Sequence, residues 1–556
     1  MTWPTTIKPY INQAYLLGLL MVALGLTLTP FLMGMSQFWL FGVWVVDGLC
    51  TKSINEKLKR FWHNTPAVLL AAFYLMHVIG LLWTSDFEYA MKDLRVKLPI
   101  LVMPFVLSGM EPLDRKRFDF VMVVYVLSVF IATLFSSVSY WRNDYEDIRE
   151  ISHFISHIRF CLNIVFCIAI VGYYLYKGVS TSSTTSEKQV PEPVEGPIQA
   201  KHPVPAFGVK TAINRFLQYF LLLWFVYQIK IFESLSGYVI LAAVVIVSAV
   251  YAFLRWKQGR GWHIAVGATA LVVLGVACFV VWCQVKPMLK VEPVDFATLE
   301  QKTAQGNDYW HDTIHNPVED GKYVGLYYCR TELQEAWTQR SALPLTDTVE
   351  STLARYLTSK DLRKDAEGVK ALTDEDIHNI EQGIANYNNW KHPGLHARLS
   401  ATLFEYNLYR RYNNPNGGSL SQRIEYTRAS FHLIGQHPWF GVGTGDVPQA
   451  FAQAYDEINS PLKEEFRFRA HNQYLAIAVA FGLVGLAFFL FVLLYPWCVS
   501  RKNHTYLYMV FLCIMLLSMF PEDTLETQAG ATLFAFFSSI FFVYLQPRKS
   551  WPTTST

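Results

Sequence analysis

The chain has 556 residues, of which 52% are hydrophobic, 15% aromatic and only 16% charged. Soluble globular proteins carry about 25% charged residues, so the composition excludes an ordinary soluble protein and indicates an integral membrane protein. The formal net charge of +3 is small, and its basic residues gather in short loops between apolar blocks. No nucleic-acid partner is therefore expected.

Apolar blocks separated by short polar hinges predict about twelve membrane spans and an all-α fold. The spans are expected at 14–33, 38–49, 66–83, 98–107, 118–139, 160–176, 216–229, 236–254, 264–285, 474–499, 506–519 and 529–545. The second, fourth and seventh are shorter than the roughly 20 residues that a bilayer needs, so the predicted range is about ten to twelve. The first has no small-residue cleavage site and is expected to be an anchor.

Basic residues mark the loops that are expected to face the cytoplasm. With a cytoplasmic N-terminus the inner loops carry Lys52, Lys57, Lys59, Arg60, Arg115, Lys116, Arg117, Arg255, Lys257, Arg260, Arg501, Lys502, Arg548 and Lys549. The positive-inside rule then places the long polar segment 286–470 on the outer side.

The predicted organisation follows from this pattern of apolar and polar segments. It consists of helices one to six at 1–177, a disordered cytoplasmic linker at 178–214, helices seven to nine at 215–285, an external helical loop at 286–470, helices ten to twelve at 471–546 and a cytoplasmic tail at 547–556. The linker is rich in Ser, Thr and Pro and has no period that could bury a core.

Helix signals run through the large loop that precedes the tenth span. The segments 341–362, 372–390, 395–413 and 421–438 have helical patterns, and Thr373 is suited to cap the second of them. On the same outer side, an amphipathic helix is expected from Phe87 to Leu94, with Lys92 and Lys97 off its apolar stripe. These lysines either anchor a solvated connector or contact lipid phosphates.

Ionisable side chains on the outer side are the candidates for chemistry. They are Arg159, Lys230, Arg398, Arg410, Arg411, Arg423, Arg428, Arg467, Arg469 and His471. A guanidinium offers a fork of donors suited to two phosphate oxygens, which favours a diphosphate ligand, although arginines are also common on solvated loops.

His471 opens the tenth span and is the best candidate for a general base, because histidine titrates nearest to neutrality. The alternative is an interfacial histidine with satisfied hydrogen bonds. Two histidine pairs, His153 with His157 and His311 with His315, have the i, i+4 spacing of a metal site but no evident third ligand. No metal and no cofactor is expected.

Glycines in "HPWFGVGTGD" do not follow a strand, so they are weak evidence for a phosphate-binding loop. Gly441, Gly443 and Gly445 are instead interpreted as a loop hinge that lets the backbone approach the membrane.

The stretch "HNQYLAIAVAFGLVGL" resembles the O-antigen ligase and Wzy-type polymerase family. The family pattern is a His, a small polar residue, nine residues, then Gly-x-x-Gly and an aliphatic residue, matched by His471, Asn472, Gly482, Gly485 and Leu486. Upstream, "SQRIEYTRASFHLIGQHPWFGVGTGD" is similar to the family's Arg-containing helix and Gly-x-Gly turn. The resemblance is strong over 421–490 and architectural elsewhere. Gly482 and Gly485 are expected to let a neighbouring helix or a lipid tail pack closely.

The resemblance implies a bacterial inner-membrane glycosyltransferase with a periplasmic loop, acting in O-antigen, lipopolysaccharide or other cell-envelope polysaccharide synthesis. Such enzymes transfer a glycan from undecaprenyl diphosphate to an acceptor hydroxyl on a glycan, lipid or protein, with inversion and without a metal. Ligation is favoured. The alternatives are a Wzy-type polymerase or a protein O-oligosaccharyltransferase, and more remotely a polysaccharide transporter, for which Asp47 and His77 are the few polar candidates inside spans.

Site roles implied by the resemblance are a catalytic His471 and a phosphate-binding Arg423, with Arg428 and Arg411 as further candidates. Where the family has an arginine this chain has Ser236, and Arg159 or Lys230 is the expected substitute. An acidic partner is expected in "PEDTLETQ", with Glu522 and Glu526 as the main candidates and Asp523 between them.

Overall fold

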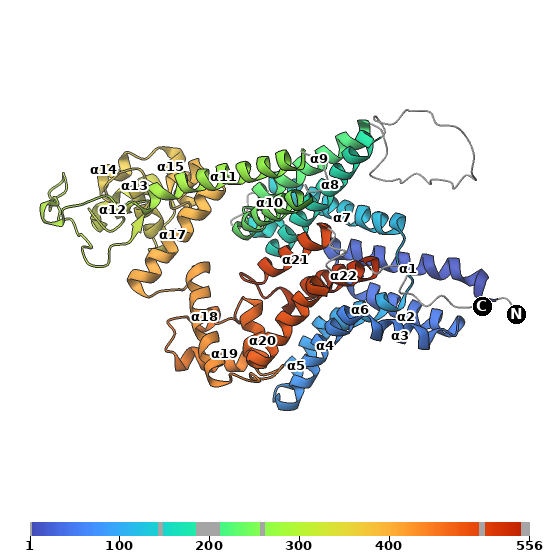
Figure 1. The fold of residues 1–556 in the computed structure, drawn as a ribbon. Coiled ribbons are helices and arrows are strands. Elements are labelled where there is room, and N and C mark those ends of the chain that lie inside the picture. Colours follow the sequence, from blue (N-terminus) through green and yellow to red (C-terminus); the bar gives the residue numbers. More distant parts are fainter. Residues whose placement is uncertain (1–2, 143–147, 185–211, 256–261, 500–505, 546–556) are drawn as a thin grey trace. The chain divides into compact units, whose positions relative to one another are not determined.

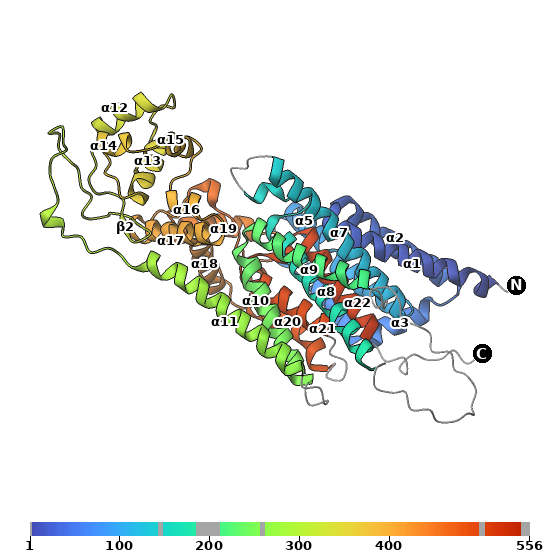
Figure 2. The ribbon, with the colours of Figure 1, turned by 90° about the horizontal axis from the view of Figure 1, so that it is seen from above.

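The computed structural model describes residues 3–142, 148–184, 212–255, 262–499 and 506–545. The regular secondary structure of these residues is helical apart from two short strands, which confirms the all-α part of the predicted fold class (Figures 1 and 2). The chain divides into two compact units. Unit 1 is formed by Met1–Leu271, Ala429–Ala454 and Phe468–Thr556, and unit 2 by Val272–Arg428 and Tyr455–Arg467. The segment 429–454, expected as part of the external loop, therefore groups with the apolar helices.

Unit 1 contains most of the apolar helices. Its helices are α1 (Trp3–Leu28), α2 (Pro30–Cys50), α3 (Ile54–His63), α4 (Thr65–Ile79), η1 (Gly80–Trp83), α5 (Phe87–Lys97), α6 (Pro99–Gly109), α7 (Arg115–Arg142), η2 (Ile148–Ile151), α8 (His157–Thr184), α9 (Ala212–Phe232), α10 (Leu235–Arg255), α20 (Gln473–Val499), α21 (Tyr506–Ser518), η6 (Thr524–Glu526) and α22 (Gln528–Leu545). Three helices have residues in both units, namely α11 (Trp262–Leu289), α18 (Ser419–Gln436) and α19 (Val447–Glu457).

Eight helices of the described chain are long and apolar enough to cross a membrane, and α21 and α22 are shorter apolar helices. A multi-pass membrane protein is thus supported, but the predicted count of about twelve is not confirmed. The expected span at 98–107 forms α6, which has only 11 residues and contains Pro104.

The predicted boundary of the first span, 14–33, is wrong. Helix α1 ends at Leu28 and Pro30 occupies the first turn of α2. Thr29 is extended, with φ of −164° and ψ of 126°, as expected for a residue that precedes proline. Proline also has no backbone N–H to continue the preceding helix, so the chain breaks there.

The expected linker at 178–214 overlaps helices at both ends. Helix α8 continues to Thr184 and α9 begins at Ala212. The linker prediction for 185–211 lies outside the described residues.

Helix α22 lies among the other helices of unit 1 and packs against α6, α1, α2, α4 and α21 (Figure 1). Ala531, Phe536, Ile540 and Phe541 on this helix are fully buried. The short turn that precedes α22 is therefore attached to a helix that is buried from Gly530 to Phe541.

Helix α20 is interrupted at Gly482, where φ is 67° and ψ is −169°. A segment without regular secondary structure, 438–443, fills the interruption. The carbonyls of Val479 and Ala480 accept hydrogen bonds from the amides of Val442 and Gly443, both at 2.9 Å. On the other side of the break, the amides of Leu483 and Val484 donate to the carbonyls of Pro438 and Trp439. The segment thus supplies the partners that a continuous helix would have provided.

The glycines of this region lie in close contact with neighbouring parts of the chain. A Cβ on Gly441 would overlap the backbone of Ala480 and Phe481, and one on Gly443 would lie 2.7 Å from Oγ1 of Thr84. A Cβ on Gly445 would overlap the carbonyl of Asp86. Gly482 likewise accepts close packing, but its neighbour is the backbone of 439–440, not another helix.

Unit 2 has a small core of its own. Its elements are η4 (Phe296–Thr298), β1 (Val318–Glu319), β2 (Lys322–Tyr323), α12 (Arg330–Arg340), α13 (Asp347–Ser359), α14 (Ala366–Lys370), α15 (Asp374–Glu381), α16 (Tyr387–Lys391), α17 (Leu395–Tyr412) and η5 (Glu464–Phe466). The strands pair antiparallel, with Val318 opposite Tyr323. Trp337 and Tyr356 are fully buried in the core. The four predicted helical segments are confirmed, and Thr373 forms a capping box with Asp376.

Candidate active site

His471 lies immediately before α20 and has a left-handed backbone with φ of 45°. This conformation costs an L-residue about 1–2 kcal/mol, and such strain collects at functional sites. The next residue, Asn472, caps the helix by accepting the amides of Tyr474 and Leu475 at 3.0 and 3.1 Å. The imidazole contacts Phe468 edge-on, and its side chain is 34% exposed. The ring is therefore held at the helix mouth yet open to a substrate.

An acidic turn between α21 and α22 faces this imidazole. Glu522 and Asp523 are both buried, and Oε2 of Glu522 lies 4.0 Å from Nδ1 of His471. One potential ligand atom from each of the three residues lies within 4.8 Å of the others. Burial raises the pKa of the Asp523 carboxyl, although Arg469 opposes the shift.

Arg159 reaches the same carboxylate from α8. Its Nη2 lies 3.9 Å from Oε2 of Glu522, and its side chain is only 13% exposed. Nε of Arg159 is buried without a hydrogen-bond partner among the described residues. The other expected substitute for the family arginine, Lys230, is exposed on α9, and Ser236 lies in the first turn of α10. Arg159 is thus the basic residue that the structure brings to His471.

The predicted acidic candidates Glu522 and Glu526 point to different partners. Glu526, at the end of η6, lies 2.6 Å from Nζ of Lys97 and 3.4 Å from Nη1 of Arg469. Asp93 also pairs with Lys97. Glu522 is therefore the carboxylate nearest His471, whereas Glu526 belongs to a buried ion network.

Charge pairing decides the protonation of this network. Burial alone would raise the pKa of Glu526, but Lys97 and Arg469 outweigh it and lower the pKa. Burial alone would lower the pKa of Lys97, but Asp93 and Glu526 raise it. The charged forms of Lys97 and Glu526 thus stabilise each other in a site with little solvent.

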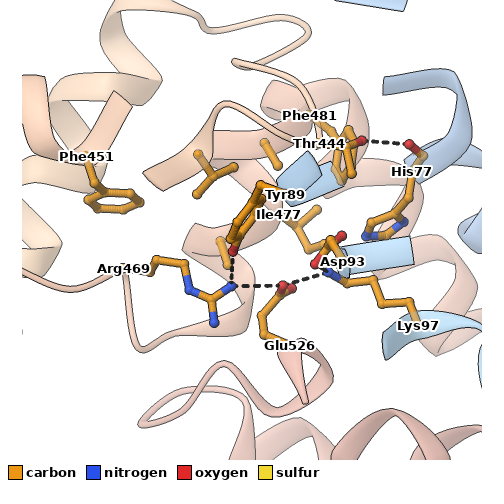
Figure 3. A pocket seen from close by; sticks show the side chains of 13 residues that line it. His77, Tyr89, Asp93, Lys97, Thr444, Phe451, Arg469, Ile477, Phe481 and Glu526 are labelled. Atoms are coloured by element: carbon orange, nitrogen blue, oxygen red, sulfur yellow. Dashed lines mark hydrogen bonds and ion pairs between the residues drawn. The ribbon is translucent and has the colours of Figure 1, made fainter. Parts of the chain in front are cut away.

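A pocket lies beside the network and is shown in Figure 3. Arg469, Tyr89 and Glu526 form its polar side, and Phe451, Ile477 and Phe481 are among its apolar lining residues. His77, expected as an isolated polar residue in a span, also lines it and is bonded through Nδ1 to the carbonyl of Phe73 at 3.0 Å.

The predicted loop arginines Arg411, Arg423 and Arg428 lie in unit 2, whereas His471 lies in unit 1. Arg428 pairs at 2.6 Å with Glu425, which is fully buried, so a structural contact accounts for it. Arg423 is half-buried on α18. Joint binding of one diphosphate by Arg423 and the His471 site stays a prediction.

Sequence reasoning missed the network around Glu526. Lys97 was expected off the apolar stripe of its helix, as an anchoring or phosphate-binding charge, but it is fully buried. Asp93, four residues before Lys97, was the available signal, because i, i+4 pairs meet on one helix face. Arg469 and Gln473, each two residues from His471, belong to the polar stretch that precedes the apolar part of the tenth span. The sequence did not show that both bind Glu526.

A cation at the cluster of His471, Glu522 and Asp523 would meet two competing charges. Arg159 lies against Glu522, and Nη2 of Arg469 lies 3.3 Å from Asp523. The arginines partly neutralise the carboxylates that a metal would need.

Comparison with known protein families gives a match to the part of the chain that contains His471. No curated protein matches the chain. Residues 385–490 match the model of the O-antigen ligase family, and this segment contains Arg423, His471, Gly482 and Gly485. The match confirms the resemblance predicted from the sequence, and residues 385–490 are similar to the O-antigen ligase family.

Proposed function

We propose that this protein is a membrane glycosyltransferase that transfers a glycan from undecaprenyl diphosphate to an acceptor hydroxyl. The observation that carries the proposal is the group formed by His471, Glu522 and Arg159, with an imidazole 4.0 Å and a guanidinium 3.9 Å from one carboxylate oxygen. His471 and the matched family segment coincide. We propose that the reaction takes place at the outer face of a bacterial inner membrane, as the family resemblance implies, with segment 286–470 on the outer side, as the distribution of basic residues predicts.

In the proposed reaction His471 accepts the proton of the acceptor hydroxyl. The hydroxyl oxygen attacks the anomeric carbon, and the bond from that carbon to the diphosphate oxygen breaks. Undecaprenyl diphosphate leaves with the bonding electrons, so the configuration inverts in one displacement. Glu522 stabilises the imidazolium, and arginines stabilise the charge that develops on the leaving diphosphate.

Arg159 is the proposed diphosphate ligand beside the histidine. Its Nε–H is buried without a protein partner in the described chain, and its long contact with Glu522 leaves the guanidinium able to turn to a stronger anion. A phosphate ester offers two oxygens to such a fork, which a lysine ammonium cannot match. Arg423 is proposed as a second ligand on the strength of the family resemblance, with Lys230 and Arg411 as weaker candidates.

Ligation to a lipid, glycan or protein acceptor is the favoured reaction, and polymerisation uses the same chemistry. A transporter gains less support from the structure. Asp47, one of the polar residues in a span, pairs at 2.6 Å with Lys57, which also donates to the carbonyl of Trp44. This contact fixes α3 against α2 and accounts for Asp47 without a transport path.

The test is release of undecaprenyl diphosphate from a lipid-linked glycan by protein reconstituted in liposomes. His471→Ala and His471→Gln should both reduce turnover by about 100-fold or more, because neither side chain accepts a proton at neutral pH. His437→Gln is the matched control, since His437 is exposed within the same family segment and should leave turnover unchanged. If His471→Gln keeps near-normal turnover, His471 is not the general base and that part of the proposal fails.

Arg159→Lys tests the diphosphate contact. Charge is kept but the fork is lost, so we expect at least about a tenfold loss in donor turnover. The length of the glycan product separates the two reactions. Ligation gives a product of one transfer, whereas polymerisation gives a ladder of products of increasing length.

A further inference from the structure

Glu526 is bound from both sides of His471. Arg469, two residues before the histidine, places Nη1 3.4 Å from Oε2 of Glu526. Gln473, two residues after it, donates from Nε2 to Oε1 of Glu526 at 3.0 Å. Gln473 also accepts the amide of Leu525 at 2.7 Å. The five residues that contain His471 are therefore fastened at both ends to the turn that carries Glu522.

This double attachment coincides with the strained backbone of His471. A left-handed residue other than glycine persists only where its surroundings fix it. Arg469 additionally holds Asp523 at 3.3 Å, so the same guanidinium links Glu526, Asp523 and the histidine segment. Displacement of Glu526 would therefore free both the strained His471 and the carboxylates of Glu522 and Asp523 that face it.

Lys97 is the counter-charge that keeps Glu526 in place. Its ammonium lies 2.6 Å from Glu526, pairs with Asp93 on its own helix, and is 2% exposed. Tyr89, on the same helix, accepts a hydrogen bond from Arg469 at 2.8 Å (Figure 3). Lys97 and Arg469 thus share three carboxylates, those of Asp93, Asp523 and Glu526, so loss of the Lys97 charge leaves a buried carboxylate without full compensation.

We infer that Lys97 is a positioning residue for His471, acting through Glu526 and the turn from Glu522 to Glu526. The inference rests on the proposed role of His471 as the base. Lys97 belongs to a helix that sequence reasoning assigned to the membrane surface, and it reaches the site only through Glu526. It sets the relation between the imidazole and Glu522 without contacting the reacting atoms.

The test uses Lys97→Met, which keeps the apolar stem and removes the charge. Turnover per folded molecule should fall by at least about tenfold, because small displacements of catalytic groups are costly, while KM for the lipid-linked donor changes less than about threefold. Lys92→Met is the matched control, since Lys92 is an exposed lysine of the same helix that pairs with Glu88. It should behave like the unmodified protein.

A second readout does not depend on activity. The rate at which diethyl pyrocarbonate modifies His471, followed on its peptide by mass spectrometry, should change in Lys97→Met, because Glu522 moves relative to the ring. Glu526→Gln keeps the shape of the side chain and should give the same two effects if Lys97→Met does not fold.

The outcomes separate the two proposals. A variant that is less stable but keeps its turnover per folded molecule and its His471 modification rate would make Lys97 a purely structural residue and overturn the inference. If His471→Ala itself retains turnover, the proposed function fails instead. If His471→Ala is inactive and Lys97→Met is normal in both readouts, only the inference about Lys97 fails.

Discussion

Gly482→Ala should destabilise the protein severely, although it adds a single methyl group to an apolar helix. The backbone at Gly482 has φ of 67° and ψ of −169°, which is accessible essentially only to glycine. A Cβ there would approach the backbone of Trp439 and Phe440 more closely than the 3.0 Å that real Cβ atoms keep. Neither neighbour is a flexible side chain that could move aside.

The expected cost has two parts. Backbone strain contributes about 1–3 kcal/mol. Displacement of 439–440 also breaks the two pairs of backbone hydrogen bonds that join 438–443 to α20, at about 1 kcal/mol for each bond. The total of about 5–7 kcal/mol is comparable with the whole stability of many proteins.

Gly172→Ala is the matched control for this prediction. Gly172 lies within α8 with no atom within 4 Å of an added Cβ, so alanine should change stability by no more than about 1 kcal/mol. The measurement is the unfolding midpoint and folded yield of both variants in the same detergent. Equal midpoints would show that the break in α20 can close into a regular helix, and the reasoning would be refuted.

Three further predictions concern other parts of the chain. Asp446→Ala should cost about 1–3 kcal/mol, because Asp446 accepts the amides of Ser85 and Asp86 at 2.9 and 2.8 Å. Burial alone would raise the pKa of Asp446, but the amides of Asp86 and Ser85 lower it, so its contribution is present above the ordinary aspartate pKa and should be lost from an acid melt as pH falls through the lowered value. Burial lowers the pKa of Lys364 to about 7, so between about pH 7 and 10.5 the unfolded chain binds more protons than the folded chain. The stability of unit 2 in thermal melts should therefore rise with pH over that window. The rise should be absent in Lys364→Met. Gln382→Cys, exposed on unit 2, should react with an impermeant thiol reagent on intact spheroplasts when the native cysteines are replaced, and labelling only after lysis would reverse the predicted topology.

Cys329 is unsuitable for that labelling experiment. It is the only cysteine of the segment 286–470, which makes it the obvious choice from the sequence. The structure buries it, with 3% of its surface exposed, so a folded protein would protect it whichever side it faces. An exposed position is needed to separate topology from burial.

Local signals were sufficient for much of the fold and part of the site. Apolar blocks indicated the membrane helices, and Thr373 marked a helix start because its side chain accepts an amide within the next turn. The polar mouth before α20 drew attention to His471, and the acidic turn to Glu522. Each of these signals lies within a few neighbouring residues, where periodicity and capping chemistry operate.

Long-range pairing was beyond the sequence. Lys97 and Glu526 are 429 positions apart, and nothing in the helix around Lys97 distinguishes a buried ion pair from a solvated charge. Arg159 and Lys230 were equivalent as basic residues at helix ends, and only packing of α8 placed one of them near Glu522. Gly482 fitted a helix–helix contact by spacing, whereas its positive φ and the inserted segment depend on contacts some 40 residues upstream.

The interrupted backbone of α20 has a consequence for how the protein enters its membrane. Near the break, two carbonyls and two amides of this helix depend on partners from 438–443, and unpaired backbone groups cost several kcal/mol each in hydrocarbon. The final form of α20 therefore cannot be reached by a span that is inserted alone. Segment 438–443 is synthesised before α20. It must therefore stay at the membrane surface until α20 emerges, and the two must enter the membrane together.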